Sequence, residues 1–186
     1  HARVKAINTE KAMAVPGVHA VLTASELAPL SLHWMPTLAG DQQRVLADGK
    51  VLFQAQEVAF VVADDRYAAA DGVAAVEVEY EELPVIVDPF KAEADDAPVL
   101  REDIADQKEG AHGPRRHPNH IFTWESGDLE ATESVLAEAD VVAEEMIYYH
   151  RTHPCPLETC GSVASMDKVN GKLTVWGTFQ APHAVR

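Results

Sequence analysis

Four side chains that could bind a metal lie close together near the end of the chain: His150, His153, Cys155 and Cys160. The prolines at 154 and 156 favour an extended backbone, in which neighbouring side chains alternate between opposite sides. Structural zinc sites usually combine ligand pairs from separated elements. We therefore predict two reduced thiols and two hydrogen-bonded histidines and no metal ligand, with a zinc site as the alternative.

A carboxylate, Glu158, and a carboxamide, Gln180, stand at the two ends of a predicted hairpin. The last residues are typical of a strand that runs into the start of a helix, yet Arg186 comes before two helical turns could be completed. The first residue is histidine and not methionine. We therefore expect the sequence to be the front part of a longer protein, with most of its chemistry beyond residue 186 and no catalytic residue inside it.

The composition is that of a globular, acidic protein. Of its 186 residues, 47% are hydrophobic and 24% are charged, with a formal net charge of -15. Most of the acidic excess lies in residues 1–139, which would repel nucleic acids and anionic membranes. The sequence contains no long apolar run and no secretory signal pattern, so we expect a cytoplasmic protein without a membrane span.

The spacing of apolar and turn residues predicts mixed α/β structure in the first 88 residues. Strands are expected at 2–7, 18–22, 45–46, 51–53, 58–62 and 76–81, and helices at 9–14, 24–27 and 66–76. Asp48-Gly49 predicts a hairpin turn, and the strand at 58–62 is expected to be buried throughout. Glu77, Glu79 and Glu81 alternate with apolar residues, which favours a solvated strand face over catalytic carboxylates.

Two irregular segments are expected, at residues 28–43 and 89–118. The first could pack against a neighbouring protein or on its own domain. The second ends in a basic island, residues 112–120, which could bind a phosphate or an acidic subunit; pairing with carboxylates of this chain is favoured. A strand at 121–125, a helix after Asp128 with Leu129, Thr132, Val135 and Leu136 on its inner side, and a strand at 141–149 should follow. The predicted domains are therefore 1–88, a linker at 89–118, and an incomplete domain at 119–186.

Several segments of the first domain are similar to one protein family. They are residues 16–24, 64–71, 78–85 with Asp88, and 97–100. They resemble the hammerhead-type α/β domain of molybdenum hydroxylase large subunits, the xanthine dehydrogenase and aldehyde oxidase superfamily. Further segments, at 38–40, 111–114, 119–124, 153–161 and 180–183, resemble the carbon monoxide dehydrogenase branch of that family.

The resemblance implies a function for the parent protein and a role for two residues. The parent would oxidise carbon monoxide with water to carbon dioxide at molybdopterin cytosine dinucleotide carrying molybdenum and copper. Electrons would pass to a flavoprotein subunit with FAD and an iron-sulfur subunit with 2Fe-2S clusters, in a dimer of heterotrimers. Gln180 would donate a hydrogen bond to an oxo ligand of molybdenum, and Glu158 would order the surroundings of the site.

Two other functions remain open at this point. The copper-binding cysteine loop and the active-site glutamate of the family lie downstream of the matching segments, so neither Cys155 nor Cys160 is equated with the copper ligand. Without that loop, an aldehyde or N-heterocycle hydroxylase large subunit is the alternative within the family. A non-catalytic acidic α/β binding module is the alternative outside it.

Overall fold

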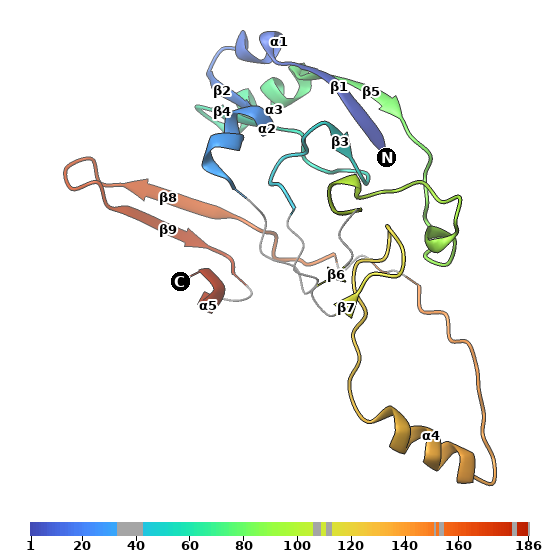
Figure 1. Cartoon of the computed structure of the whole chain (residues 1–186). Coiled ribbons are helices and arrows are strands. Elements are labelled where there is room, and N and C mark those ends of the chain that lie inside the picture. Colours follow the sequence, from blue (N-terminus) through green and yellow to red (C-terminus); the bar gives the residue numbers. More distant parts are fainter. Residues whose placement is uncertain are drawn as a thin grey trace. The chain divides into compact units, whose positions relative to one another are not determined.

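The computed structural model describes residues 1–32, 43–105, 109–110, 113–150, 152, 155–179 and 182–185. The chain divides into two units, His1–Gly127 and Asp128–Arg186 (Figure 1). Both contain helices and antiparallel strands, which confirms the predicted mixed α/β class. No helix among these residues is long and apolar enough to cross a bilayer.

A three-stranded antiparallel sheet organises the first unit. Strand β1 (Ala2–Asn8) lies in its centre, between β3 (Lys50–Val51) and β5 (Glu77–Glu82). The buried residues Ala2, Ala47 and Val51 form a small core beneath the sheet, with Val4 and Val58 packed against it. These side chains are small or β-branched, so they fit the close spacing of a pleated sheet.

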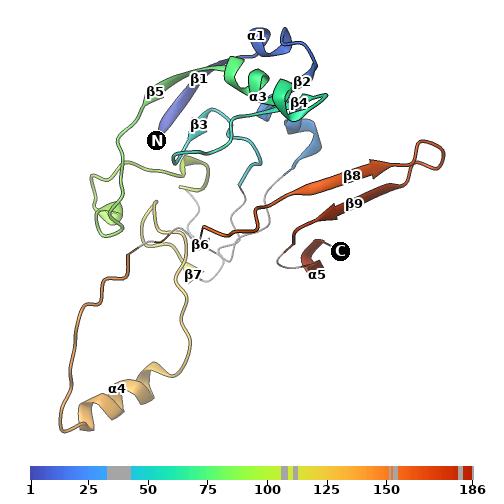
Figure 2. The same cartoon turned by 180° about the vertical axis from the view of Figure 1, so that it is seen from behind.

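A helix-covered strand pair forms the other half of this unit. Strands β2 (Val18–Thr23) and β4 (Ala59–Ala63) pair in antiparallel fashion, and α3 (Arg66–Ala75) packs on them (Figure 2). Asp65 caps α3 by accepting hydrogen bonds from two backbone N–H groups. Gly72 lies on the packed side of α3, where a Cβ atom would stand 2.9 Å from methyl groups of Val18 and Val61.

Short helices join these strands. α1 (Glu10–Met13) connects β1 to β2, and α2 (Ala24–Leu27) follows β2 and leads into the 3-10 helix η1 (Ala28–Leu30). α2 begins with a capping box, in which Thr23 accepts from Ser25 N and Glu26 accepts from Thr23 N. The hydrogen bonds from Thr23 lower the pKa of Glu26 to about 2.

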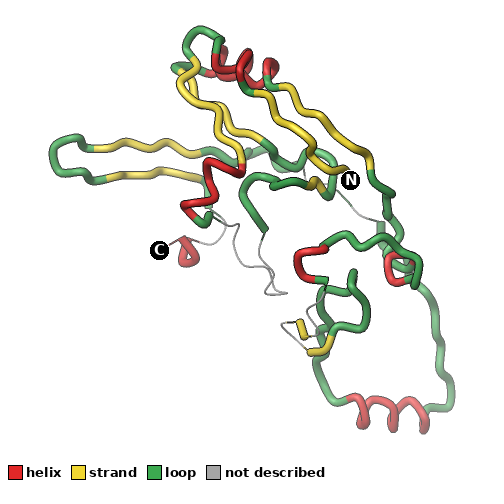
Figure 3. Tube along the Cα trace, turned by 45° about the horizontal axis from the view of Figure 1, so that its top comes forward, coloured by secondary structure: helices red, strands yellow, loops and turns green. Residues whose placement is uncertain are grey.

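Irregular chain dominates from β5 to the end of this unit (Figure 3). It contains two 3-10 helices, η2 (Lys91–Glu93) and η3 (Glu102–Ile104), and a short strand pair, β6 (Glu109–Gly110) with β7 (Gly113–Pro114). The predicted strand at 121–125 is wrong, because these residues lie in irregular chain.

The second unit holds one longer helix and a hairpin. α4 (Leu129–Glu138) is capped by Asp128, which accepts from Ala131 N, as predicted. Strands β8 (Ser162–Met166) and β9 (Leu173–Gly177) pair as the predicted hairpin, and α5 (Pro182–Val185) follows. The expected strand at 141–149 is wrong: these residues are outside regular structure, and no strand pairing of the described residues includes them.

Two further expectations about the first unit are corrected. The Asp48-Gly49 hairpin does not form, because β3 pairs with β1, Gly49 O accepts from Val4 N, and Asp48 pairs with Arg44. The strand at 58–62 is not buried throughout, since Phe60 and Val62 are exposed while alternate residues are half-buried. Most of the loop predicted at 28–43 falls on residues 33–42, which lie outside the described residues.

Candidate functional site

The β8–β9 hairpin carries the segment with the predicted site residues. Its turn is closed by Asp167 N donating to Lys172 O and Gly171 N donating to Asp167 O, at 2.9 and 2.8 Å. Gly171 has φ of 72°, a left-handed conformation that glycine adopts without a side-chain penalty. A tight turn therefore sets the register of the whole hairpin.

The opposite end of the hairpin is where the candidate site lies. Thr178 N donates to Gly161 O at 3.2 Å, which adds one hydrogen bond beyond the last strand pair. Glu158 precedes Gly161 by three residues, a reach of about 10 Å at most. Gln180 follows Thr178 by two residues and lies outside the described residues. The pairing of Thr178 with Gly161 therefore makes both chain segments leave from one end of the hairpin.

The structure shows how Glu158 and Phe179 lie at this end. The Glu158 side chain is exposed. The ring of Phe179 lies over Gly177, where a Cβ atom would meet the ring Cζ at 2.6 Å. Gly177 and Phe179 were not predicted as part of the site; the available signal was a glycine at the end of a strand two residues before an aromatic side chain.

One face of the hairpin is apolar. Cross-strand partners share a face, and Met166 with Leu173 and Ala164 with Val175 form successive pairs on the same side. Among the described residues of 128–186 none is a buried hydrophobic residue. This unit therefore has no core formed by its described residues alone, and the inner side predicted for α4 is exposed.

The described side chains among the possible metal ligands near the hairpin do not form a metal-binding group. Cys155 and Cys160 are free and exposed, and the His150 ring packs edge-on against Tyr148 with centroids 4.6 Å apart. His153 lies outside the described residues. Across the part of the chain that is described, no group of three or more His, Cys, Asp and Glu side chains could hold a metal ion.

The glutamates of β5 lie on a solvated face, as predicted. Glu77 is exposed and pairs with Lys11 of α1, and Glu81 pairs with Lys5 of β1 at 3.5 Å. Exposed pairs of this kind contribute about 0–1 kcal/mol each. They are ordinary surface ion pairs and not the close carboxylate pairs that acid–base catalysis uses.

The basic island at 112–120 is bound to its own unit, which confirms the favoured prediction for Arg116, because Arg116 pairs with Glu93 at 3.1 Å. Arg115 donates to the backbone carbonyls of Ile104, Pro118 and His120. His120 is the buried polar residue of this region, and its ring accepts from Arg116 N. These contacts fix the shape of the loop.

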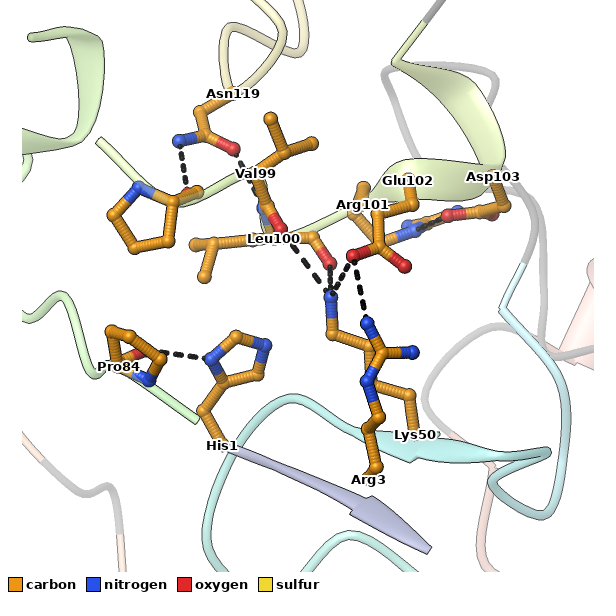
Figure 4. Close-up of polar contacts among 11 residues, drawn as sticks. His1, Arg3, Lys50, Pro84, Val99, Leu100, Arg101, Glu102, Asp103 and Asn119 are labelled. Carbon is orange, nitrogen blue, oxygen red and sulfur yellow. Dashed lines mark hydrogen bonds and ion pairs between the residues drawn. The ribbon is translucent and has the colours of Figure 1, made fainter. Parts of the chain in front are cut away.

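A polar network links the linker to the three-stranded sheet (Figure 4). Lys50 of β3 and Asn119 both bind the segment 98–100, and Glu102 pairs with Arg3 and Lys50. A hydrogen bond from Arg101 holds the pKa of Asp103 below its usual range. The network orders the irregular chain between the two predicted domains.

Two family models match most of this chain. The first, described as "Aldehyde oxidase and xanthine dehydrogenase, a/b hammerhead domain", matches residues 1–84. The second, described as "Molybdopterin cofactor-binding domain", matches residues 112–186 and so includes both ends of the β8–β9 hairpin.

Curated relatives divide into a near and a distant group. The carbon monoxide dehydrogenase large chains of Afipia carboxidovorans and Hydrogenophaga pseudoflava are 67% and 63% identical over all 186 residues. The nicotine 6-hydroxylase large subunit of Paenarthrobacter nicotinovorans is 27% identical over the whole chain. The chain spans 23% of the length of the two near relatives and 22% of the distant one.

Solved structures give the same division. A reconstituted CO dehydrogenase from Oligotropha carboxidovorans matches 99% of this chain with a TM-score of 0.91 and 67% identity, over 23% of its own chain. Quinoline 2-oxidoreductase from Pseudomonas putida 86 matches 96% of this chain with a TM-score of 0.73 and 28% identity, over 22% of its own chain.

Proposed function

This chain belongs to the aldehyde oxidase and xanthine dehydrogenase family, and we propose that it is part of the large chain of an enzyme that oxidises carbon monoxide with water to carbon dioxide. The proposal rests on the difference in sequence identity between two groups of relatives. Two carbon monoxide dehydrogenase large chains are 67% and 63% identical, whereas the nicotine hydroxylase subunit is 27% identical over the same length. A difference in substrate within one fold is expected to follow such a division.

The cofactor of this enzyme would be molybdopterin cytosine dinucleotide with molybdenum and copper. When bound, the metals would supply the two-electron oxidation of carbon monoxide. The described residues hold no metal-ligating cluster, so this part of the protein fits hydrogen bonding to the cofactor better than direct ligation of its metals. Exposed Cys155 and Cys160 are not assigned to copper.

Gln180 is the residue proposed to touch the cofactor. A carboxamide N–H can donate to an oxo ligand of molybdenum without adding charge to the site. The short connection from the Thr178–Gly161 hydrogen bond to Gln180 supports this role, because a hairpin end restrains the chain beside it. Glu158 leaves the same end of the hairpin and is proposed to order the site through hydrogen bonds.

The predicted domain boundaries and partners are part of this proposal. We assign residues 1–88 to the hammerhead domain, 89–118 to the linker, and 119–186 to the molybdopterin-binding domain. A flavoprotein subunit with FAD and an iron-sulfur subunit with 2Fe-2S clusters would accept the electrons, in a cytoplasmic dimer of heterotrimers. The described second unit has no core of its own, which disfavours a free-standing binding module.

The test is a substrate comparison on the complete enzyme purified from the cells that make it. Carbon monoxide should support dye reduction at a rate far above that with aldehydes or N-heterocycles. Gln180→Leu should lower kcat about a hundredfold, the usual effect of removing one donor from a catalytic oxygen site, while molybdenum content stays unchanged. Preference for an aldehyde or N-heterocycle would refute the substrate assignment, and unchanged kcat in Gln180→Leu would refute the role of Gln180.

A further inference from the structure

Residues 98–100 lie in the part of the chain that neither family model matches, between the matched ranges 1–84 and 112–186. This tripeptide, Pro98-Val99-Leu100, is irregular in structure, so its backbone groups cannot be satisfied by a strand partner or a helix. Two side chains bind it instead: Lys50, which lies in the first matched range, and Asn119, which lies in the second (Figure 4).

Lys50 binds the tripeptide from the hammerhead domain. Its ammonium donates to Val99 O at 3.3 Å and to Leu100 O at 3.0 Å, and it pairs with Glu102 at 3.4 Å. The Lys50 side chain is only 15% exposed, whereas the Glu102 side chain is 54% exposed. An ammonium removed from water to this degree needs fixed acceptors, and the two carbonyls supply them.

Asn119 binds the same tripeptide from the molybdopterin-domain match. Its Oδ1 accepts from Leu100 N at 2.8 Å, and its Nδ2 donates to Pro98 O at 3.0 Å and to Ala92 O at 2.9 Å. The Asn119 side chain therefore binds residues 98–100 through both its acceptor atom and its donor atom. An aspartate could not donate to the two carbonyls, and an aliphatic residue could not make any of these bonds.

We propose that Lys50, Asn119 and residues 98–100 form a polar clasp that holds the hammerhead domain and the start of the molybdopterin domain together. The two side chains share one tripeptide, so releasing either one loosens the backbone that the other binds. Both residues lie in the first unit, so the clasp acts inside one compact unit. It does not depend on which substrate the enzyme oxidises.

Hydrogen exchange at the Leu100 amide tests this coupling. That N–H donates to Asn119 Oδ1, and the Lys50 ammonium, itself only a donor, cannot accept from it, so Asn119→Ala must speed its exchange whether or not a clasp exists. The informative variant is Lys50→Met, which keeps the aliphatic stem and removes the donors. The clasp predicts that Lys50→Met speeds Leu100 exchange about tenfold in the complete enzyme, because losing the charged donors to Val99 O and Leu100 O loosens the tripeptide backbone.

Three controls separate coupling from general damage. Lys5→Met removes a surface ion pair from the same sheet and should leave Leu100 exchange unchanged. Lys50→Arg keeps charged donors and should recover most of the protection. Amides of β4, which pairs with β2 in a separate sheet from the one that holds Lys50, report whether the fold is intact.

The outcomes are distinct. Faster Leu100 exchange in Lys50→Met, recovery in Lys50→Arg and unchanged β4 amides support the clasp. Leu100 exchange within twofold of the parent in Lys50→Met would overturn it, because Asn119 would then act alone. If Lys50→Met does not fold, the same comparison is made with Lys50→Gln, which retains one donor group and should give a smaller increase; no increase there would also overturn the proposal.

Discussion

Replacing Gly72 with alanine should destabilise the first unit, although alanine is the better helix former. A Cβ atom at this position would lie 2.9 Å from Val18 Cγ2 and 2.9 Å from Val61 Cγ1. Ordinary contacts between carbon atoms are about 3.5–4.0 Å, so each methyl group would have to retreat by about 0.6 Å or more. Both valines are β-branched residues within strands, where χ1 is restricted and offers little room to move.

The expected magnitude follows from two opposing terms. Alanine in place of glycine gains about 1 kcal/mol in a helix interior. Overpacking of a close contact costs about 1–3 kcal/mol. Gly72→Ala should therefore lower the local stability of α3 and β4 by about 1 kcal/mol, which corresponds to about fivefold faster amide exchange in β4.

Two variants make this test specific. Asp71→Ala adds a better helix former at the neighbouring exposed position and should leave β4 exchange unchanged or slightly slower. The double variant Val61→Ala with Gly72→Ala lacks one of the two methyl groups that the new Cβ atom would meet. Its loss of stability should therefore be smaller than the sum of the losses in the two single variants. Slower β4 exchange in Gly72→Ala than in the parent would refute the reasoning, because helix propensity would then outweigh the close packing.

Three further changes have defined outcomes. Asp65→Ala removes the cap that accepts from Tyr67 N and Ala68 N, so first-turn amides of α3 should exchange about fivefold faster, and Asp65→Ser should restore protection. Gly171→Ala places a side chain at φ of 72° and should destabilise the hairpin by about 1 kcal/mol, with Gly171→Asn milder, as measured by exchange of β8 amides. The pKa of Glu26 is lowered to about 2, so its stabilising effect is present above pH 4.5 and lost as pH falls toward 2. The melting-temperature difference between Glu26→Gln and the parent should shrink over that interval, and a difference that stays constant would contradict this assignment.

Local signals in the sequence were sufficient where hydrogen bonds are local. The helices expected at 66–76 and after Asp128 both form, because the carboxylates of Asp65 and Asp128 accept from N–H groups two or three residues away. The β8–β9 hairpin was predicted for the same reason, since its turn is closed within six residues. Short-range geometry alone decides these elements.

The failures occur where distant partners decide the structure. Asp48-Gly49 has the composition of a hairpin turn, yet the strand after it pairs with β1, more than forty residues earlier in the sequence. The expected strand at 141–149 has strong apolar character but no strand partner among the described residues. A strand needs a partner for its backbone groups, and a periodic pattern does not identify that partner.

The candidate site was reached through family resemblance and only in part through residue patterns. The hairpin end is placed by the Thr178–Gly161 hydrogen bond, and the role of Glu158 beside it stays a prediction. No role was predicted for Lys50 or for Asn119, although Asn119 begins one of the segments that resemble the family, because a single lysine in a strand and a single asparagine in a loop have no distinctive spacing. Their shared contacts with residues 98–100 become evident only in three dimensions.

The metal content of the natively purified enzyme tests the central claim most directly. Molybdenum and copper should be measured by elemental analysis, normalised to this chain, after purification without chelators. We predict near-equal amounts of the two metals together with carbon monoxide-dependent dye reduction. Molybdenum without copper, in an enzyme that oxidises an aldehyde or an N-heterocycle and not carbon monoxide, would contradict it.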